Sequence, residues 1–440
     1  MKKFSDENNN LDRVEIELIQ KEDKILDDYQ IKFLQAKVLE EKILNQFSNL
    51  SKDHLHVYDI YLNDIKTEWI HTIEYGPTNE HQQQDSHQNQ RNINQIPIVL
   101  THGYGNCSLA YYKLIKFLGK SRKIYAIDWL GNGLSARPDF NLKESTDIIN
   151  FFTESLEIWR QKMKIEKFIL IGHSFGGFLS AHYTVKYQKY VENLHLLSPL
   201  GCTKNDIGIG HDEYDLNSYK KNSNLCCLKQ LFMKRLVIPK WEQEFTPKEM
   251  LNYGRCVPSN LILRLLLKFQ LKFSCEESKY MAKFLKEIYH LPNSSYKAIH
   301  RIFTFPELKA IDNNSLQEIF PLKLQIGANF YFGDKDWMDQ EGAQIMVDSQ
   351  MIKGQLFTIP NAKHDIQLDN PKYLAQILLE NCKKININGN ENFIQNYQQK
   401  YFIQQDIEKN YYKSQIGYKN NQNQYFQEKQ NFIQYNEDAI

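Results

Sequence analysis

The chain has 440 residues, of which 42% are hydrophobic and 13% aromatic, so it can bury a large core. Its 54 basic and 53 acidic residues leave a net charge of +1, which excludes chain-wide attraction to nucleic acid, and we expect no nucleic-acid partner. The seven cysteines lack metal-ligand spacing, and no signal peptide or run of about 18 apolar residues is present, which predicts a cytoplasmic protein, soluble or peripherally attached to a membrane, without a metal site.

Residues 1–55 are predicted to form an N-terminal helical segment. Ala36, Leu39, Ile43 and Leu44 recur at helical spacing within 11–47, which indicates a helix packed on the outside of the core. The alternation of apolar and polar residues over 57–75 predicts a hairpin within the first part of the core, residues 56–200. Residues 78–95 hold almost no apolar side chain, so we expect a disordered insertion there.

Short apolar runs then alternate with segments of helical length. The predicted strands are residues 96–101, 123–127, 168–171, 194–197, 329–332 and 356–359, and this order predicts an α/β fold with a mostly parallel central sheet flanked by helices. Residues 201–320 interrupt the rhythm with lysine-rich helical sequence that is too long for a crossover, so we expect an inserted helical cap. Residues 321–384 then complete the core, and 385–440 form a low-complexity tail rich in Asn and Gln.

The strongest chemical signal follows the strand at 168–171. In "FILIGHSFGG", Gly172, Ser174 and Gly176 form a G-x-S-x-G pattern between a strand and a helix. A nucleophile on such a sharp turn needs glycine two residues away on either side, because larger side chains would clash with the neighbouring strand and helix. The alternative is a serine in a glycine-rich turn without chemistry. We interpret Ser174 as the nucleophile.

A second loop supports this interpretation. "THGYGN" follows the strand at 96–101, where it can supply a backbone amide to an oxyanion hole. We expect the amides of Tyr104 and Phe175 to form that hole. His102 is interpreted as a side chain that braces the loop, because the loop contributes an amide there and no imidazole.

A catalytic serine also needs a base and an orienting carboxylate, in the chain order serine, acid, histidine. "NFYFGDKDWMD" is a strand followed by an acidic loop that contains Asp334, Asp336 and Asp339. We predict Asp336 as the acid because it lies three residues beyond Gly333, with Asp339 as the alternative. His364 follows the next strand and is the predicted base; a surface histidine is the alternative.

Together these stretches resemble the α/β-hydrolase fold family, over residues 36–382. The branch that they resemble contains the N-acyl phosphatidylethanolamine lipase and the lipid-droplet lipase coactivator with lysophosphatidic acid acyltransferase activity. The matching stretches are "THGYG" at 101–105, "DWLGNGLSARP" at 128–138, "LIGHSFGGFLSAHY" at 170–183, "FGDKDWMDQEGA" at 332–343 and "AKHDIQLDNP" at 362–371. The resemblance implies a lipase, phospholipase or acyltransferase that acts on phospholipids or lysophospholipids in lipid homeostasis.

Two details refine what the resemblance implies. His364 and Asp369 reproduce the H-x-x-x-x-D spacing of glycerolipid acyltransferases, although Asp369 can also be read as a helix N-cap before "NPKYLAQILLEN". The coactivator members of the branch lack the elbow serine, whereas this chain has Ser174. An active lipase or transacylase is therefore favoured over a catalytically idle protein that recruits a lipase.

The cap sequence indicates the substrate class. Residues 219–241 hold six basic and no acidic side chains, and residues 255–275 hold four and none, among many Leu, Ile and Phe. This pattern is typical of a helix on an anionic lipid surface such as a membrane, a lipid droplet or a mitochondrion, and also of a helix that roofs an apolar site. We expect a phosphate-bearing acyl lipid as substrate and no cofactor, with acyl-CoA as a cosubstrate if the acyl group is transferred. A soluble carboxylesterase is the runner-up.

Overall fold

One eight-stranded sheet organises the part of the chain that the computed structural model describes, residues 27–77, 96–205, 238–253, 263, 264, 267 and 273–383. The strands lie in the order β1-β2-β4-β3-β5-β6-β7-β8, with β1–β2 and β2–β4 antiparallel and all other neighbours parallel. Their bounds are β1 Leu55–Tyr61, β2 Trp69–Tyr75, β3 Ile98–Thr101, β4 Ile124–Ile127, β5 Phe168–His173, β6 Val191–Leu197, β7 Ala328–Gly333 and β8 Leu356–Ile359. The predicted hairpin and the mostly parallel sheet are confirmed.

Some predicted features lie outside the described residues. They are the insertion at 78–95, the tail from 385 onwards, and most of the two basic runs of the cap. Within the described part, no helix is long and apolar enough to cross a membrane.

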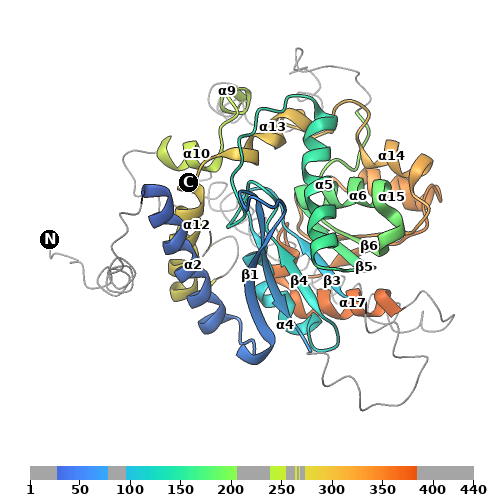
Figure 1. Ribbon diagram of the computed structural model, residues 1–440. Helices are drawn as coiled ribbons and strands as arrows, with labels where there is room; N and C mark the ends of the chain where they lie inside the picture. The colour runs from blue at the N-terminus through green and yellow to red at the C-terminus, as the bar shows by residue number, and fades with distance from the viewer. Residues whose placement is uncertain are drawn as a thin grey trace, which may run out of the picture. The chain divides into compact units, whose positions relative to one another are not determined.

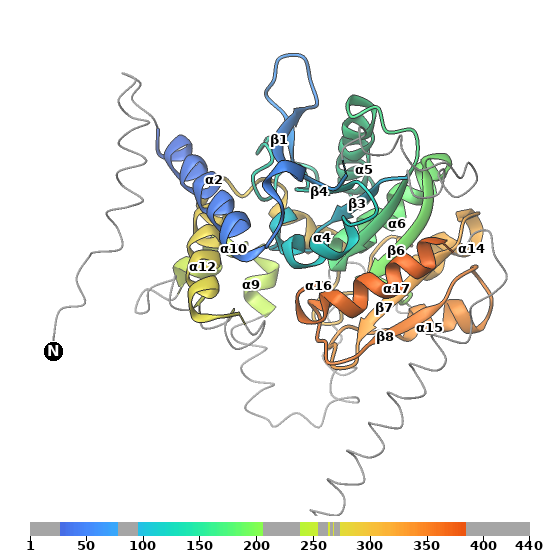
Figure 2. The same cartoon turned by 90° about the horizontal axis from the view of Figure 1, so that it is seen from below.

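Helices cover both faces of the sheet (Figures 1 and 2). α5 and α6 pack on one face with α14 and α15, while α4 and α17 pack on the other, where Asn381 of α17 donates a hydrogen bond to the Tyr331 hydroxyl of β7 at 3.1 Å. Their bounds are α4 Tyr112–Leu118, α5 Ser145–Lys162, α6 Ser174–Tyr187, α14 Leu316–Lys323, α15 Glu341–Asp348, α16 Ile366–Asp369 and α17 Pro371–Lys383.

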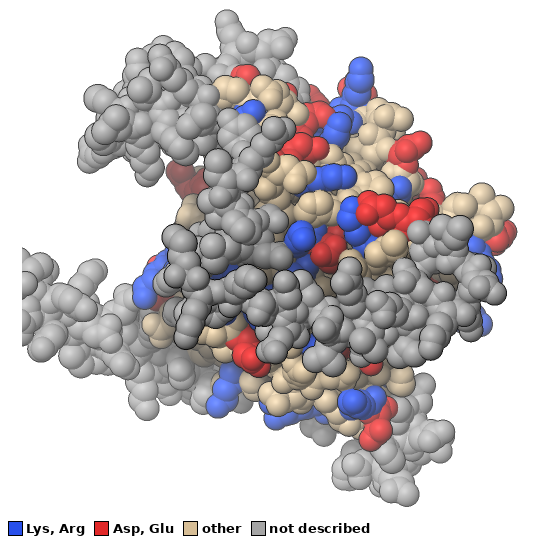
Figure 3. Space-filling model, turned by 90° about the vertical axis from the view of Figure 1, so that its left-hand side faces the viewer, with Lys and Arg blue, Asp and Glu red and all other residues tan. Residues whose placement is uncertain are grey.

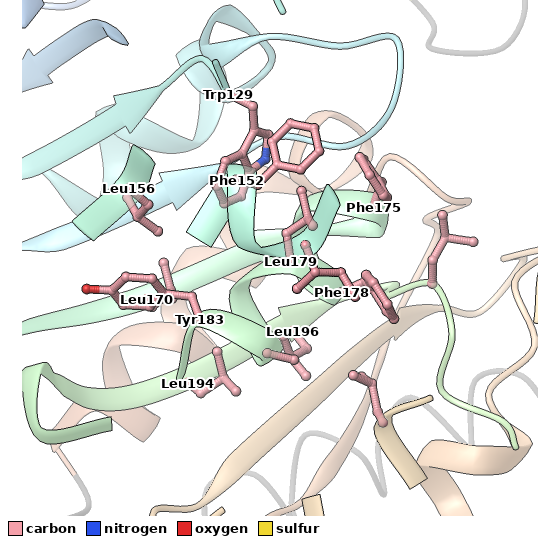
Figure 4. Packing of buried hydrophobic residues seen from close by; sticks show 14 of the residues in the cluster. Trp129, Phe152, Leu156, Leu170, Phe175, Phe178, Leu179, Tyr183, Leu194 and Leu196 are labelled. Atoms are coloured by element: carbon pink, nitrogen blue, oxygen red, sulfur yellow. The ribbon is translucent and has the colours of Figure 1, made fainter. Parts of the chain in front are cut away.

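A chain of aromatic rings forms the core beneath α5 and α6 (Figure 4). Trp129 meets Phe152 edge-on at 5.7 Å, and Phe152 meets Phe175 at 5.8 Å. Phe175 and Phe178 both contact Phe303, at 6.1 and 4.8 Å between ring centroids. Edge-to-face aromatic pairs add specificity to the burial of apolar area. The backbone at Phe175 is therefore held by a ring that is anchored in the core.

The segment between β6 and β7 leaves the sheet and returns at one place. Leu316 and Gln317 donate backbone hydrogen bonds to the carbonyls of Gly201 and Cys202, at 2.9 and 3.2 Å. Between these points lie α9 Ile238–Glu242, α10 Pro247–Tyr253, α12 Cys275–His290 and α13 Ala298–Ile302. The structure thus places a helical insertion where we expected a cap. α14 packs with the sheet, because Phe320 contacts Phe330 of β7 at 6.5 Å, so the expected boundary at 320 falls inside a core helix.

The N-terminal helix α2, Asp28–Phe47, lies beside α12 (Figures 1 and 2). Asp27 and Gln30 form a capping box that begins α2, and Phe47 contacts Tyr280 of α12 at 6.0 Å. The predicted stripe of α2 is confirmed, since all four of its members are buried: Ala36, Leu39, Ile43 and Leu44. A fifth buried residue of α2, Glu40, carries a charge.

Glu40 belongs to a buried ionic cluster with the hairpin. The imidazole of His71 donates to Glu40 Oε2 at 2.9 Å and to Asp59 Oδ1 at 2.6 Å, and Lys37 Nζ contacts Asp59 Oδ2 at 2.6 Å. Burial alone would lower the pKa of His71, but the charge of Glu40 and the hydrogen bonds to Asp59 and Glu40 raise that pKa to about 10. His71 is therefore a buried cation that joins α2 to the sheet.

We predict that Glu40→Gln lowers the free energy of unfolding at pH 7 by about 3 kcal/mol, because it removes one partner of a buried charge. Glu41→Gln is the matched control: Glu41 is its exposed neighbour, and we expect a change within about 0.5 kcal/mol. Urea unfolding of the three proteins measures both values. Equal stabilities for the two variants would contradict a structural role for the cluster.

The same cluster predicts a dependence on pH. The pKa of His71 in the folded protein is raised above that of an unfolded histidine, about 6.5, so its contribution is full below that pH. The contribution is lost as the pH rises through about 10. The wild-type free energy of unfolding should therefore fall more steeply between these pH values than that of Glu40→Gln.

Candidate active site

Ser174 is the first residue of α6, directly after β5, and its φ angle is +54°. Few residues other than glycine adopt this left-handed conformation, so the turn is held by its surroundings. A Cβ on Gly176 would lie 2.2 Å from the carbonyl oxygen of His102, and one on Gly172 would lie 2.6 Å from that of Gly176. Glycine is therefore required on both sides of Ser174, as the sequence pattern predicted.

The structure brings Ser174, His364 and Asp336 together from three separate strand ends. Ser174 Oγ lies 3.0 Å from His364 Nε2, and His364 Nδ1 lies 3.1 Å from Asp336 Oδ1. Because a carboxylate only accepts hydrogen bonds, Nδ1 carries the proton and Nε2 accepts from the serine hydroxyl. The Asp336 side chain is 3% exposed and that of His364 is 16% exposed, so the pair is shielded from most solvent.

Of the three carboxylates in the acidic loop, Asp336 alone bonds to His364. Asp339 Oδ2 accepts a hydrogen bond from the Thr203 hydroxyl at 2.6 Å, and its Oδ1 accepts from the amide of Glu341 at the start of α15. Burial favours the neutral form of Asp336, but the hydrogen bond and charge of His364 outweigh it and hold the pKa of Asp336 below its usual value. Asp339 therefore binds the start of α15, and Asp336 is the residue that orients His364.

Two hydrogen bonds join the acidic loop to the histidine loop. Asp334 Oδ1 accepts from the amide of Ala362, and the amide of Lys335 donates to the carbonyl of Ala362, both at 3.0 Å. The indole of Trp337, 65% exposed, lies 4.9 Å from the His364 ring. These hydrogen bonds hold the two loops together, and Trp337 lies exposed beside them.

His102 braces the loop that precedes α4, as the sequence predicted. Its Nδ1 donates to the Gly103 carbonyl at 2.8 Å, and its Nε2 accepts from the Trp129 amide at 3.1 Å. Burial lowers the pKa of His102, so the ring stays neutral in this role. A Cβ on Gly103 would lie 2.8 Å from the Cβ of Ser174, which brings the loop against the nucleophile.

The two expected oxyanion donors, the amides of Tyr104 and Phe175, flank the contact between Gly103 and Ser174. Tyr104 follows Gly103, and Phe175 follows Ser174 at the N-terminus of α6, where amides lack intrahelical partners. Within the described residues, no hydrogen bond engages either amide. Both remain available to a ligand oxygen.

Sequence reasoning missed a role for His173. Its Nε2 donates to the backbone carbonyl of His364 at 3.0 Å, and the two rings lie 4.9 Å apart. Burial lowers the pKa of His173 to about 4, with a further contribution from the charge of His364, so the ring is neutral at pH 7. The residue before the nucleophile thus fixes the backbone of His364; the x position of G-x-S-x-G gave no sign of this contact.

Asp369 does not cap the following helix, so the capping interpretation is wrong. The carbonyl of Asn370, one position later, accepts the first hydrogen bond of α17 from Leu374 at 3.0 Å. Asp369 Oδ2 instead accepts from the amide of Lys363 at 2.8 Å. The carboxylate therefore holds the loop that carries His364. No group of three or more His, Cys, Asp or Glu side chains in the described ranges is placed to hold a metal.

Comparison with known proteins identifies the fold. A family model described as the alpha/beta hydrolase fold matches residues 96–220. The chain has the α/β-hydrolase fold. The solved structures of naproxen esterase from Bacillus subtilis and of Cfl2 from Burkholderia cenocepacia share it, with TM-scores of 0.50 and 0.51 and identities of 15% and 17%. The match to naproxen esterase covers 81% of this chain and 99% of that protein, and the match to Cfl2 covers 75% and 96%.

The similar curated relatives include acyltransferases by name. The Arabidopsis thaliana protein named 1-acylglycerol-3-phosphate O-acyltransferase is 26% identical over 293 residues, which are 65% of this chain and 66% of that protein. The Mus musculus protein named 1-acylglycerol-3-phosphate O-acyltransferase ABHD5 is 41% identical over 105 residues, 24% of this chain and 30% of that one. The match thus spans just under two thirds of the plant relative. The predicted resemblance to this branch of α/β-hydrolases is confirmed.

We predict that Gly176→Ala lowers the free energy of unfolding by at least about 3 kcal/mol, because its Cβ would collide with the His102 carbonyl. Gly105→Ala is the control. A Cβ at Gly105 meets nothing closer than 3.7 Å. Only the strain of an alanine at φ +66° should therefore lower the free energy of unfolding, by about 1–2 kcal/mol. Thermal and urea unfolding measure both, and a Gly176→Ala protein as stable as the control would contradict the tight elbow.

Proposed function

We propose that this α/β-hydrolase is a serine acyl hydrolase of the lipase and phospholipase type, with Ser174 as nucleophile, His364 as base and Asp336 as the residue that orients it. The observation that carries the proposal is the continuous pair of hydrogen bonds from Ser174 through His364 to Asp336, at 3.0 and 3.1 Å. Such a pair allows a serine hydroxyl to lose its proton as it attacks.

The geometry supports a two-step reaction. Ser174 Oγ attacks the acyl carbonyl while His364 Nε2 takes its proton, and the carbonyl oxygen becomes an oxyanion held by the amides of Tyr104 and Phe175. His364 then protonates the leaving group, the carbon–oxygen or carbon–nitrogen bond breaks, and an acyl ester remains on Ser174. The negative Asp336 stabilises the imidazolium that forms between these events.

The second step depends on the acceptor. Water gives a proton to His364 Nε2 as it attacks the acyl ester; the bond between the acyl carbon and Ser174 Oγ then breaks, and His364 returns the proton to Oγ, which releases a fatty acid and free Ser174. A lysophosphatidic acid hydroxyl in place of water would yield phosphatidic acid; with acyl-CoA as the acyl donor, the first step breaks the carbon–sulfur bond and His364 protonates the leaving CoA thiolate. The reaction needs no metal or organic cofactor, because the nucleophile, the base and the oxyanion donors all come from the chain.

The names of the relatives support glycerophospholipids as substrates. They favour acyl transfer to lysophosphatidic acid as the second candidate activity. The sequence signal for acyl transfer was the spacing of His364 and Asp369, which resembles an acyltransferase motif. The hydrogen bond from the Lys363 amide supports a narrower role for Asp369, that of positioning the His364 loop in either reaction.

We also propose peripheral contact with a lipid surface such as a membrane or a lipid droplet. Trp337 supports it, because indole side chains favour the boundary between lipid and water and this one lies exposed beside His364. On the face shown in Figure 3, the described Lys and Arg side chains are interspersed with Asp and Glu. The described residues of that face therefore form no patch of a single charge sign, and the proposed contact with lipid depends on Trp337.

The triad assignment predicts different losses for the two acidic residues. Ser174→Ala and Asp336→Asn should each lower kcat for a short acyl ester by about 10³-fold or more, because nucleophile and imidazole orientation are lost. Asp339→Asn should stay within about threefold, since Asp339 contacts Thr203 and the start of α15. Rates of ester hydrolysis measure the three effects.

Labelling by a fluorophosphonate separates the rival functions. An activated Ser174 should react in the wild type and fail to react in Ser174→Ala. Wild-type protein that does not label would contradict the enzyme proposal and favour an idle protein that recruits a lipase. Labelling together with turnover of short esters but of no phospholipid would favour a soluble carboxylesterase.

A further inference from the structure

An apolar cavity lies under α12, next to the catalytic loops. Its volume is about 190 Å³, and α12 contributes Met281, Leu285 and Tyr289, which recur every four residues on one side of the helix. Leu368 of α16 also lines the cavity. A dry apolar cavity of about 150 Å³ already binds a benzene-sized molecule, so this one has room for a hydrocarbon.

Two of the lining residues belong to the catalytic loops. Gly105 lines the cavity two residues after Gly103, which passes Ser174, and Asp365 lines it directly after His364. The Tyr289 hydroxyl donates a hydrogen bond to the carbonyl of Gly105, which ties α12 to the loop that follows β3. The cavity therefore adjoins the loop of the expected oxyanion amide and the loop of His364.

The lining of the cavity favours the acyl chain of a phospholipid over its phosphate. Among the lining residues that the structure describes, Asp365 alone has an acidic or basic side chain, a carboxylate. A phosphate would meet an apolar wall and a like charge there, which costs free energy. A hydrocarbon chain meets neither obstacle.

We propose that the cavity under α12 holds the acyl chain of the substrate and that Met281 and Leu285 set the accepted chain length. The proposal rests on the proposed function, because it assumes that an acyl group is bound at Ser174. The head group then lies outside this cavity, and the carbonyl lies between the amides of Tyr104 and Phe175.

Alkyl fluorophosphonates with butyl and dodecyl chains test chain length directly. Met281→Trp fills the cavity and should slow labelling by the dodecyl probe by about tenfold or more, while the butyl probe stays within about twofold. Leu285→Ala widens the cavity and should shift the preference toward the longer probe. It also keeps the test decisive if Met281→Trp does not fold.

Phe284→Trp is the matched control, because Phe284 is buried on the same helix but does not line the cavity. It should leave the ratio of dodecyl to butyl labelling unchanged. A ratio that ignores Met281→Trp and Leu285→Ala, or that follows Phe284→Trp equally, would overturn the assignment.

Binding without chemistry separates the cavity from the triad. The Ser174→Ala protein should enhance the fluorescence of cis-parinaric acid, and adding Met281→Trp should weaken this binding by about fivefold or more. Binding that Met281→Trp weakens, in a wild type that does not label, would support the cavity and contradict the proposed function. Labelling without such binding would support the function and overturn the cavity.

Discussion

The site depends on the close approach between the β5–α6 turn and the loop that contains His102. Gly176 passes the His102 carbonyl so closely that a methyl group does not fit, and Gly103 passes Ser174 in the same way. These two contacts place the nucleophile, the start of α6 and the amide of Tyr104 at one point. Every other element of the site is arranged around that point.

Long-range contacts hold the remaining parts in register. Two hydrogen bonds to the backbone of Ala362 join the acidic loop to the histidine loop, and His173 donates to the carbonyl of His364. On the cap side, Tyr289 of α12 bonds to Gly105. α2 packs against α12 and is joined to the sheet through Glu40 and His71. The N-terminal helix is therefore linked physically to the cavity that we assign to the acyl chain.

Much of the site could be predicted because its residues follow strands. Parallel strands end at one edge of a sheet, so the loops that carry Ser174, Asp336 and His364 had to meet there. The choice between Asp336 and Asp339 could only be ranked, because both lie in one loop and its turn decides which one reaches His364. The geometry favours Asp336.

Other contacts had no sequence signal. His173 and His364 are 191 positions apart, and Tyr289 and Gly105 are 184 apart, so neither hydrogen bond leaves a local pattern. The role of Asp369 was hidden for a different reason. Its place before a helix is also that of a cap, and only the path of the loop directs its carboxylate to Lys363.

Product analysis by mass spectrometry tests the central claim, that Ser174 carries the acyl chemistry. Wild type and Ser174→Ala would each receive N-acyl phosphatidylethanolamine, or lysophosphatidic acid with acyl-CoA. Free fatty acid, and any phosphatidic acid, should appear with the wild type and disappear in the variant. Phosphatidic acid formed at an undiminished rate by Ser174→Ala would contradict the claim and move the transfer chemistry to His364 and Asp369.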